Sequence, residues 1–447
     1  MLMPASLQDW LGPKHLARFV VDCVESLNLT RIEASYAGRG ERPYRPKMLI
    51  ALLFYGYATG VFSSRKLERA CFDSVVFRYI AANTSPDHDT IADFRRRALP
   101  YLPDIFVQIL LIAKELDMLK VGQISLDGTK VKASASKHRS LSYAHAGKIK
   151  AKLRREVAQL MKRAEQSESE PEPDLDIPAE IARREARIAR IDQARATIAQ
   201  REAERHAVLK AAHLERLQRR REYLATTGKL PKGPRPKLPP FRVNPKAQVN
   251  LTDEDSRIMP TANGFEQGYN AQACVDMNSR LIVSCSVTQA TNDKQQIQWA
   301  LDELLSLPSA LGKVEALAAD AGYCSAANVQ RCEDAGVVPY LSLRRERHNS
   351  WLSTQSRKPD GELGPDATGM ERMKHRLQTK AGRALYGERK STVETTFGIV
   401  KSANGFRAFM LRGLPKVRGE WTLACAAYDL KMLCNLVAAC SNEAKAA

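Results

Sequence analysis

The spacing of apolar residues changes at Val121, and this change constrains the fold of the 447-residue chain more than any other feature. Before Val121, apolar residues recur every three or four positions, as on one face of a helix. This pattern predicts helices over 16–27, 46–60, 63–82, 88–97 and 103–119. After Val121, short apolar or alternating runs predict strands within 121–133, 247–290, 314–320 and 337–343, with helices over 294–307 and 325–336. A helical domain followed by a mixed α/β core is the expected fold.

Local features add detail to this outline. Asp127 and Gly128 follow the apolar run 124–126, which predicts a strand that ends in a turn at this pair. Residues 277–280 predict a hairpin turn between two strands. Residues 344–385 are basic and are expected to be rich in loops, and helices over 387–403 and 421–439 are expected to close the chain.

Residues 144–240 are highly charged and nearly free of aromatic side chains. They contain 23 Lys or Arg and 14 Asp or Glu, a local excess of nine positive charges. Isoleucines at 181, 188, 191 and 198 have the spacing of a coiled coil. We therefore expect two helical arms, 147–166 and 178–225, that form a hairpin, followed by a Pro-rich basic linker over 228–240. A solvated helix without a partner is the alternative.

The net charge indicates a polyanionic partner. Lys and Arg total 69 against 50 acids, which gives a net charge of +19 and a pI near 9.6. Clustered cations bind nucleic acid by releasing the counterions condensed on phosphate. A membrane surface with acidic lipids and a charge that serves only solubility are the alternatives. The sequence contains no evident signal peptide, and its apolar stretches are expected to be too short to cross a membrane. Its nine scattered cysteines form no C-x-x-C pair, and an odd number of such thiols fits a reducing cytoplasm.

Three acids are the candidates for chemistry: Asp127, Asp320 and Glu394. The two aspartates follow apolar strands and the glutamate lies in a predicted helix, so the three can converge although they are distant in sequence. Carboxylate oxygens suit Mg²⁺ or Mn²⁺, and two such ions support phosphoryl transfer without a nucleophilic side chain. Taken alone, each acid also has a structural interpretation: a turn residue, a helix cap and a solvated surface glutamate, respectively.

Two further observations bear on this choice. Glu394 shares a predicted helical face with Lys390, Phe397 and Lys401, which suits a metal ligand beside a phosphate backbone, although a ladder of i,i+4 ion pairs would produce the same pattern. Asp293 is the nearest rival acid, and its structural interpretation is an N-cap for the helix predicted over 294–307.

These segments resemble a known family. Residues 126–133, 317–323 and 386–401 are similar to the three catalytic regions of insertion-sequence DDE transposases, which have a ribonuclease-H-like core. The last segment resembles the tyrosine–arginine–glutamate–lysine signature of that superfamily, with Glu394 and Lys401 at the expected spacing. Tyr386 and Arg389 fall one residue too early, so either Lys390 takes the basic role or the signature is relaxed.

The resemblance extends to about three quarters of the chain in the right order. Residues 42–71 and 85–97 are similar to the N-terminal helical domain of these transposases, and 249–260, 264–276 and 287–297 to their strand region. The resemblance implies that the chain has four parts. These are a helical DNA-binding domain (1–120), the first strand region of the catalytic core (121–143), a charged helical-hairpin insertion with its linker (144–246), and the remainder of a ribonuclease-H-like core with a C-terminal helix (247–447).

The resemblance also implies an activity and its residues. The enzyme would bind the terminal inverted repeats of its element, cleave DNA and join the 3′-hydroxyl ends to target DNA, as a homodimer on DNA in the bacterial cytoplasm. Two Mg²⁺ or Mn²⁺ ions would be held by Asp127, Asp320 and Glu394. Phosphate contacts would come from Lys401, from Arg389 or Lys390, and from Arg95, Arg96 and Arg97 of the N-terminal domain. A DNA-binding derivative without catalysis and a host nuclease of the same fold are the alternative functions.

Overall fold

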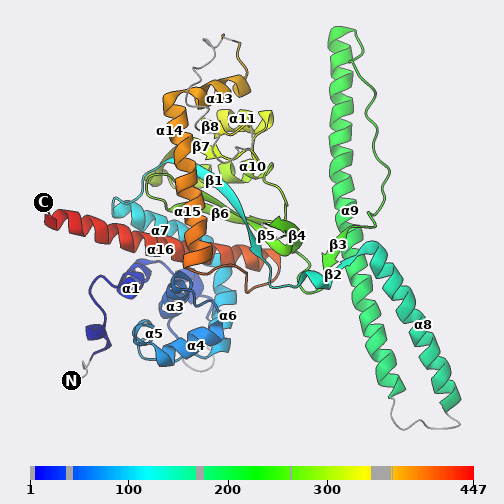
Figure 1. Ribbon diagram of the computed structural model, residues 1–447, viewed down its shortest axis with the longest axis horizontal. Coiled ribbons are helices and arrows are strands. Elements are labelled where there is room, and N and C mark those ends of the chain that lie inside the picture. The colour runs from blue at the N-terminus through cyan, green and yellow to red at the C-terminus, as the bar shows by residue number, and fades with distance from the viewer. Residues whose placement is uncertain are drawn as a thin grey trace. The chain divides into compact units, whose positions relative to one another are not determined.

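The computed structural model describes residues 6–36, 44–167, 176–261, 264–343, 364 and 366–446 (Figure 1). The chain divides into two compact units. The first comprises Met1–Ser134 together with Ile258–Ala447, and the second comprises Ala135–Arg257.

The N-terminal part of the first unit is helical, as the apolar spacing predicts. Its elements are η1 (Leu7–Trp10), α1 (Leu16–Ser26), α2 (Thr30–Glu33), α3 (Pro46–Thr59), α4 (Ser64–Asp73), α5 (Val75–Ile80), α6 (His88–Ala98), η2 (Leu99–Tyr101) and α7 (Leu102–Glu115). One prediction was wrong, because the helix expected over 63–82 is two helices. They are separated at Ser74, whose extended backbone (φ −112°, ψ 123°) ends α4 before α5 begins.

A mixed sheet forms the centre of the first unit. Its strands are β1 (Val121–Lys132), β4 (Arg257–Thr261), β5 (Gly264–Asp276), β6 (Ile282–Thr288), β7 (Gly312–Ala319) and β8 (Val338–Leu341). Their order is β4-β5-β1-β7-β8, and β6 also pairs with β5. β1 is antiparallel to β5 and parallel to β7, and β7 is parallel to β8. The expected turn over 277–280 is confirmed, since it joins the antiparallel strands β5 and β6.

The expectation that the first strand ends at Asp127 was wrong. β1 continues through Asp127 and Gly128, and its pairing with β5 runs on to the Lys132–Gly268 pair. Gly128 lies opposite Gln272 of β5, so the Asp-Gly pair is held in the strand by its neighbour. Asp127 is therefore an interior residue of the central strand.

Helices cover the sheet and close the chain. They are α10 (Gln296–Ser306), η4 (Ser309–Leu311), α11 (Ala326–Asp334), α13 (Gly369–Gln378), α14 (Lys380–Arg389), η5 (Lys390–Glu394), α15 (Thr395–Gly398), η6 (Ile399–Ala403) and α16 (Leu414–Ala446). The elements from α14 to η6 follow one another without a break, and η5 and η6 are π-helical turns. Much of the region 344–385 was expected to be loop. Its part 344–363 lies outside the described residues, whereas α13 and α14 occupy most of 369–389.

The C-terminal helix α16 lies between the sheet and the N-terminal helices α1 and α3 (Figure 1). Trp421, Leu423 and Leu430 are fully buried there. Within the described residues, Leu414–Cys440 is the one single helix long and apolar enough to cross a membrane, and α3 with α4 passes the same test only as a pair bent by 97°. This corrects the expectation that every apolar stretch is too short. Half of the helix is buried inside the protein, so core packing accounts for its composition.

The second unit contains two long helices and a small sheet. Its elements are η3 (Lys137–Arg139), β2 (Ser140–Ser142), α8 (Tyr143–Ser167), α9 (Ile177–Thr227) and β3 (Gln248–Asn250), which pairs antiparallel with β2. Ile191 of α9 packs in a buried cluster with Ala146 and Leu153 of α8. Ile198 belongs to a second cluster with Val249. Ile191 thus packs against α8, whereas Ile198 packs beside β3.

Candidate active site

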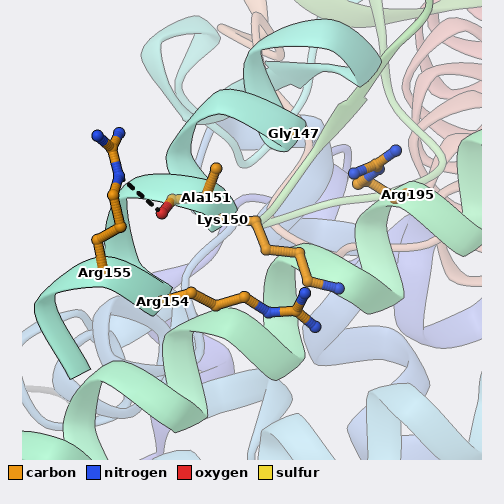
Figure 2. A pocket seen from close by; sticks show the side chains of 6 residues that line it. All are labelled: Gly147, Lys150, Ala151, Arg154, Arg155 and Arg195. Atoms are coloured by element: carbon orange, nitrogen blue, oxygen red, sulfur yellow. Dashed lines mark hydrogen bonds between the residues drawn. The ribbon is translucent and has the colours of Figure 1, made fainter. Parts of the chain in front are cut away.

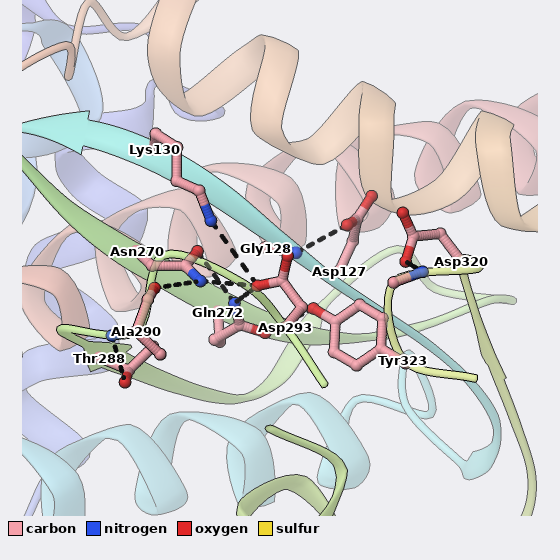
Figure 3. A network of polar contacts seen from close by, with 11 residues as sticks. Asp127, Gly128, Lys130, Asn270, Gln272, Thr288, Ala290, Asp293, Asp320 and Tyr323 are labelled. Carbon is pink, nitrogen blue, oxygen red and sulfur yellow. Dashed lines mark hydrogen bonds and ion pairs between the residues drawn. The ribbon is translucent and has the colours of Figure 1, made fainter. Parts of the chain in front are cut away.

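The sheet register places Asp127 beside Asp320. Leu126 of β1 pairs with Ala319 of β7 in the parallel ladder; Asp127 is the next residue of β1, and Asp320 directly follows the end of β7. Figure 3 shows the two carboxylates close to each other. Asp320 follows the carboxyl end of β7, where ligands commonly bind in such a sheet, and Asp127 lies beside it within β1. The structure therefore brings together two of the three predicted acids.

Asp127 is a buried carboxylate with an unusual protonation equilibrium. Its side chain is 20% exposed, and its oxygens accept hydrogen bonds from its neighbour Gly128 N (2.7 Å) and from Arg389 Nη1 (3.3 Å). Burial raises the pKa of Asp127 from 3.8 to about 6; Arg389 opposes this rise, and the charge of Asp320 adds to it. The carboxylate is thus ionised at neutral pH but sits close to its titration range.

Asp320 begins a tight turn after β7. Its Oδ1 accepts a hydrogen bond from Gly322 N at 2.8 Å, and its carbonyl accepts one from Tyr323 N at 3.2 Å. A Cβ on Gly322 would stand 2.9 Å from Asp320 Oδ1, so a glycine at this position lets the carboxylate fold back over the turn. The turn therefore holds the Asp320 carboxylate in place and also positions the backbone of Tyr323.

Glu394 joins the site through Arg389. Arg389 ends α14 and Glu394 ends the π-helical turn η5, where hydrogen bonds close over five residues instead of four. Arg389 Nη2 lies 3.6 Å from Glu394 Oε1, while its Nη1 pairs with Asp127. The guanidinium is only 6% exposed, whereas the Glu394 side chain is 56% exposed. Arg389 is therefore the cation that links the first and third acids.

Lys401 approaches the same face of β1. Its Nζ donates to Thr129 Oγ1 at 3.0 Å and to the carbonyl of Lys130 at 3.1 Å. Side chains two apart on a strand share a face, so Thr129 lies on the face of Asp127. Burial lowers the pKa of Lys401, and the charge of Arg407 adds to this effect. Lys401 thus contacts Thr129, which is two residues from Asp127 on the same face of β1.

A polar network not predicted from the sequence includes Gln272 and Asn270 of β5 (Figure 3). These residues pair with Gly128 and Lys130, which lie on the face of β1 opposite Asp127. Asp293 Oδ1 accepts hydrogen bonds from Asn270 Nδ2 (2.6 Å) and Gln272 Nε2 (2.8 Å). Gln272 Oε1 accepts a hydrogen bond of 2.5 Å from the hydroxyl of Tyr323. Lys130 Nζ completes the group at 3.8 Å from Asp293 Oδ1. The expectation that Asp293 caps a helix was wrong, because α10 begins at Gln296 and has Gln295 as its N-cap.

The network connects the strands that carry the two aspartates. Gly128 lies directly against it: a Cβ at this position would collide with Gln272 Nε2 and stand 2.9 Å from Asp293 Oδ1. Gln272 thus contacts the residue after Asp127 and, through Tyr323, the turn that follows Asp320. Burial raises the pKa of Tyr323, and the charges of Asp293, Asp127 and Asp320 raise it further. The signal in the sequence was the pair Asn270 and Gln272, two amides on one face of an otherwise apolar strand.

Two family models match the chain. A transposase domain of the DUF772 family matches residues 5–97, and a transposase DDE domain matches residues 235–430. The second match contains Asp320, Arg389 and Glu394, and the sheet places Asp127 next to Asp320. The chain belongs to the insertion-sequence DDE transposases. Comparison with curated proteins and with solved structures finds no match.

The family matches leave residues 98–234 of the transposase uncovered, and Asp127 lies in this gap. The sheet register is therefore the observation that places Asp127 beside Asp320. Helices α8 and α9 fall entirely within the same gap. The family membership makes DNA the partner of the transposase and associates its chemistry with divalent metal ions.

The three consecutive arginines of α6 do not share one environment. Arg95 is buried, and its Nη1 donates to the carbonyl of Phe62 (2.9 Å) and to the hydroxyl of Tyr57 (3.3 Å). Arg96 and Arg97 are exposed; Arg96 pairs with Asp93, and Arg97 lies 4.9 Å from the ring centre of Tyr36. The expectation that all three reach phosphate is thus corrected for Arg95, whose guanidinium is used inside the helical domain.

The residues of the site fit a divalent cation by donor chemistry. Asp127, Asp320 and Glu394 offer carboxylate oxygens, the ligands that Mg²⁺ and Mn²⁺ prefer. In the described part of the transposase, however, no group of three or more His, Cys, Asp or Glu side chains is arranged to hold a metal ion. Arg389 stands between Asp127 and Glu394 and provides the positive charge that these two carboxylates share.

Proposed function

We propose that the transposase binds the terminal inverted repeats of its element, cleaves DNA there and joins the 3′-hydroxyl ends to target DNA. The observation that carries this proposal is the adjacency of Asp127 and Asp320 at neighbouring strands, with Arg389 connecting them to Glu394. The sheet supports a ribonuclease-H-like core, since its central strand has antiparallel neighbours on one side and parallel neighbours on the other.

Asp127, Asp320 and Glu394 would hold two divalent cations, Mg²⁺ or Mn²⁺. When bound, such ions activate an attacking oxygen and stabilise the leaving oxygen of a phosphodiester. Neighbouring side chains would assist the three acids. Arg389 would orient Asp127 and Glu394, and the ammonium group of Lys401 beside β1 would contact a phosphate near the cut. Lys390 is exposed at the start of η5 and would contact the backbone further out.

Each part of the chain would have its own role in the reaction. Residues 1–120 would recognise the repeats, with Arg96 and Arg97 contacting phosphates. Residues 121–143 and 247–447 would form the catalytic core, and 144–246 an insertion within it. Because transposition requires two DNA ends held together, the active form would be a homodimer on DNA in the bacterial cytoplasm.

The test is strand cleavage of a duplex that carries the end of the element, with Mg²⁺ or Mn²⁺ and without either ion. Asp127→Asn, Asp320→Asn and Glu394→Gln should each abolish cleavage, because every acid is required, while DNA affinity stays within about twofold. Asp302→Asn, which changes an exposed acid of α10, is the matched control and should cut normally. Cleavage by the Asp127→Asn variant would refute the assignment.

Joining is tested separately from cutting. A product in which the 3′-hydroxyl end is attached to a second duplex would support the full reaction. Cleavage without such a product would identify a nuclease, and DNA binding without cleavage would identify a DNA-binding derivative. Terminal inverted repeats and short target duplications in the DNA that flanks the gene should accompany a functioning transposase.

A further inference from the structure

An open cavity with a basic lining lies between α8 and α9 of the second unit (Figure 2). Its volume is about 470 Å³. The lining residues are Gly147, Lys150, Ala151, Arg154 and Arg155 of α8 and Arg195 of α9. Four of these six side chains are cations and none is acidic, so the cavity concentrates positive charge.

The sequence of α8 explains why these side chains gather. Residues three and four apart share a helical face, and positions 147, 150, 151, 154 and 155 follow this spacing. Gly147 and Ala151 are small, so they leave the hollow that the long cations surround. A Cβ on Gly147 would stand 3.3 Å from Arg195 Nη1, which indicates that the glycine allows the close approach of α9.

Arg195 is held in position by an aromatic ring. Its guanidinium carbon lies 4.4 Å from the centre of the Tyr143 ring, a distance typical of a cation–π contact. Such a contact uses the face of the guanidinium and leaves the N–H groups at its edge able to donate. Arg195 is therefore oriented before any ligand binds.

The positive charge of the cavity is only partly neutralised. Lys150 Nζ donates to Asp192 Oδ2 at 2.6 Å. Among the residues that the structure describes, Arg154 and Arg195 have no carboxylate within 4.0 Å, although such pairs are frequent elsewhere on the same two helices. The second unit contains 28 Lys or Arg against 17 acids, so it holds +11 of the net charge of +19.

We propose that this basic cavity binds the phosphate backbone of DNA without reading its sequence. Arginine forms paired hydrogen bonds with phosphate oxygens, and Arg154 and Arg195 supply such donors from two different helices. The lining offers no aromatic ring to stack a base and no acid to bind a sugar hydroxyl or a base amino group. The inference rests on the proposed function, because it takes the DNA of the transposition reaction as its ligand.

A membrane surface fits the cavity less well. Helices that bind acidic lipids present an apolar face beside their cations. Ala146, Ile149 and Leu153 of α8, which adjoin lining residues in sequence, instead pack in the cluster with Ile191 of α9. The chemistry at the cavity is thus cationic without an adjoining apolar surface, which favours a polyanion in water.

The experiment measures binding of the full-length protein to a fluorescent duplex by anisotropy, over a series of salt concentrations. The double variant Arg154→Gln/Arg195→Gln should bind about tenfold or more weakly, and the slope of log affinity against log salt should be shallower by roughly two. The control Arg183→Gln/Arg219→Gln removes the same charge from arginines that are 77% and 72% exposed and paired with acids of α9. The control should retain the affinity and slope of the unmodified protein.

The outcomes separate this inference from the proposed function. If the double variant and the control bind alike while the unmodified protein binds and cleaves DNA, the inference is overturned and the proposed function stands. If the unmodified protein binds no DNA at low salt, both fall together. The inference would also be overturned if the double variant lost binding to inorganic phosphate or to phosphatidylserine vesicles while its DNA binding stayed unchanged. Circular dichroism checks the fold, and Arg154→Glu, at an exposed position, repeats the test without altering helix packing.

Discussion

Arg389 and Glu394 contact each other, with Nη2 and Oε1 3.6 Å apart, because the turn between them is π-helical. In an α-helix, residues four apart stack on one face, whereas a π-helical turn brings residues five apart into line. Arg389 lies one residue earlier than the family signature requires, and the π-helical turn compensates for this extra residue. This geometry supports the proposal that Arg389, rather than the exposed Lys390, takes the basic role in the signature.

Arg389 is expected to set the acid limit of cleavage. Its charge opposes the effect of burial on Asp127, so replacing it by Gln should raise the pKa of Asp127 above about 6. A neighbouring arginine typically lowers the pKa of a carboxyl by one to three pH units. The acid limb of the pH–rate profile should therefore move to higher pH by about one unit or more. An unchanged limb, in a variant that still cleaves, would show that Asp127 does not depend on Arg389.

The unmodified protein should itself lose cleavage activity below about pH 6. Cation binding requires the ionised form of Asp127, whose pKa is raised to about 6. Because metal ions compete with protons for the carboxylate, the acid limb should move to lower pH as the Mg²⁺ concentration increases. Rates measured from pH 5 to 8 at two Mg²⁺ concentrations check this, and a limb insensitive to Mg²⁺ would point to another group.

The raised pKa of Asp127 also predicts how the free energy of unfolding depends on pH. Low pH disfavours cleavage but favours the folded state. The folded protein binds the proton of Asp127 more tightly than the unfolded chain does, so this residue contributes stability that is fully present below pH 3.8. The contribution is lost as the pH rises through about 6 and amounts to roughly 3 kcal/mol. Denaturant unfolding without divalent ions should show this loss in the unmodified protein and not in Asp127→Asn. Parallel pH profiles of the two proteins would contradict it.

The sequence predicts the elements of the fold better than their polar contacts. Apolar spacing locates most helices and strands because burial of one face dictates it. Two predicted residues, Asp127 and Asp320, are neighbours for the same reason, since both follow buried runs of adjacent strands. The π-helical turn at η5 could not be predicted, because its hydrogen bonds differ from those of an α-helix only in spacing. The role of Asp293 depends on amides of β5, which are distant in sequence.

The network beneath β1 is expected to position the two aspartates. Gln272→Leu leaves the Tyr323 hydroxyl without its hydrogen-bond partner and removes one of the two amide hydrogen bonds to Asp293 Oδ1. A buried unsatisfied group costs about 1–3 kcal/mol. Tyr323→Phe removes only one hydroxyl and should cost about 1 kcal/mol. Both variants should lower the cleavage rate while leaving DNA affinity unchanged. Tyr340→Phe removes a hydroxyl from the neighbouring strand β8 and is the control. Equal rates in Tyr323→Phe and Tyr340→Phe would show that the network only stabilises the fold.

The arginines of α6 should separate stability from DNA binding. Arg95 is four residues from Ile91 and three from Ala98, both buried, so the helix directs its side chain inward. There it donates to Tyr57, whose hydroxyl in turn donates to the buried carboxylate of Glu420 at 2.9 Å. Burial raises the pKa of Glu420, and the charge of Arg95 counters that rise.

Arg95→Met should therefore destabilise the protein by about 1–3 kcal/mol, because it removes the hydrogen bonds to Tyr57 and Phe62 and the positive charge near the buried Glu420. The double variant Arg96→Ala/Arg97→Ala should change the free energy of unfolding by less than about 1 kcal/mol, since both side chains are exposed. It should instead weaken DNA binding about equally for all sequences and reduce the salt slope by roughly two. Denaturant unfolding and anisotropy measure the two effects. If Arg95→Met remained stable and lost the salt-dependent binding, Arg95 would have to reach the DNA itself.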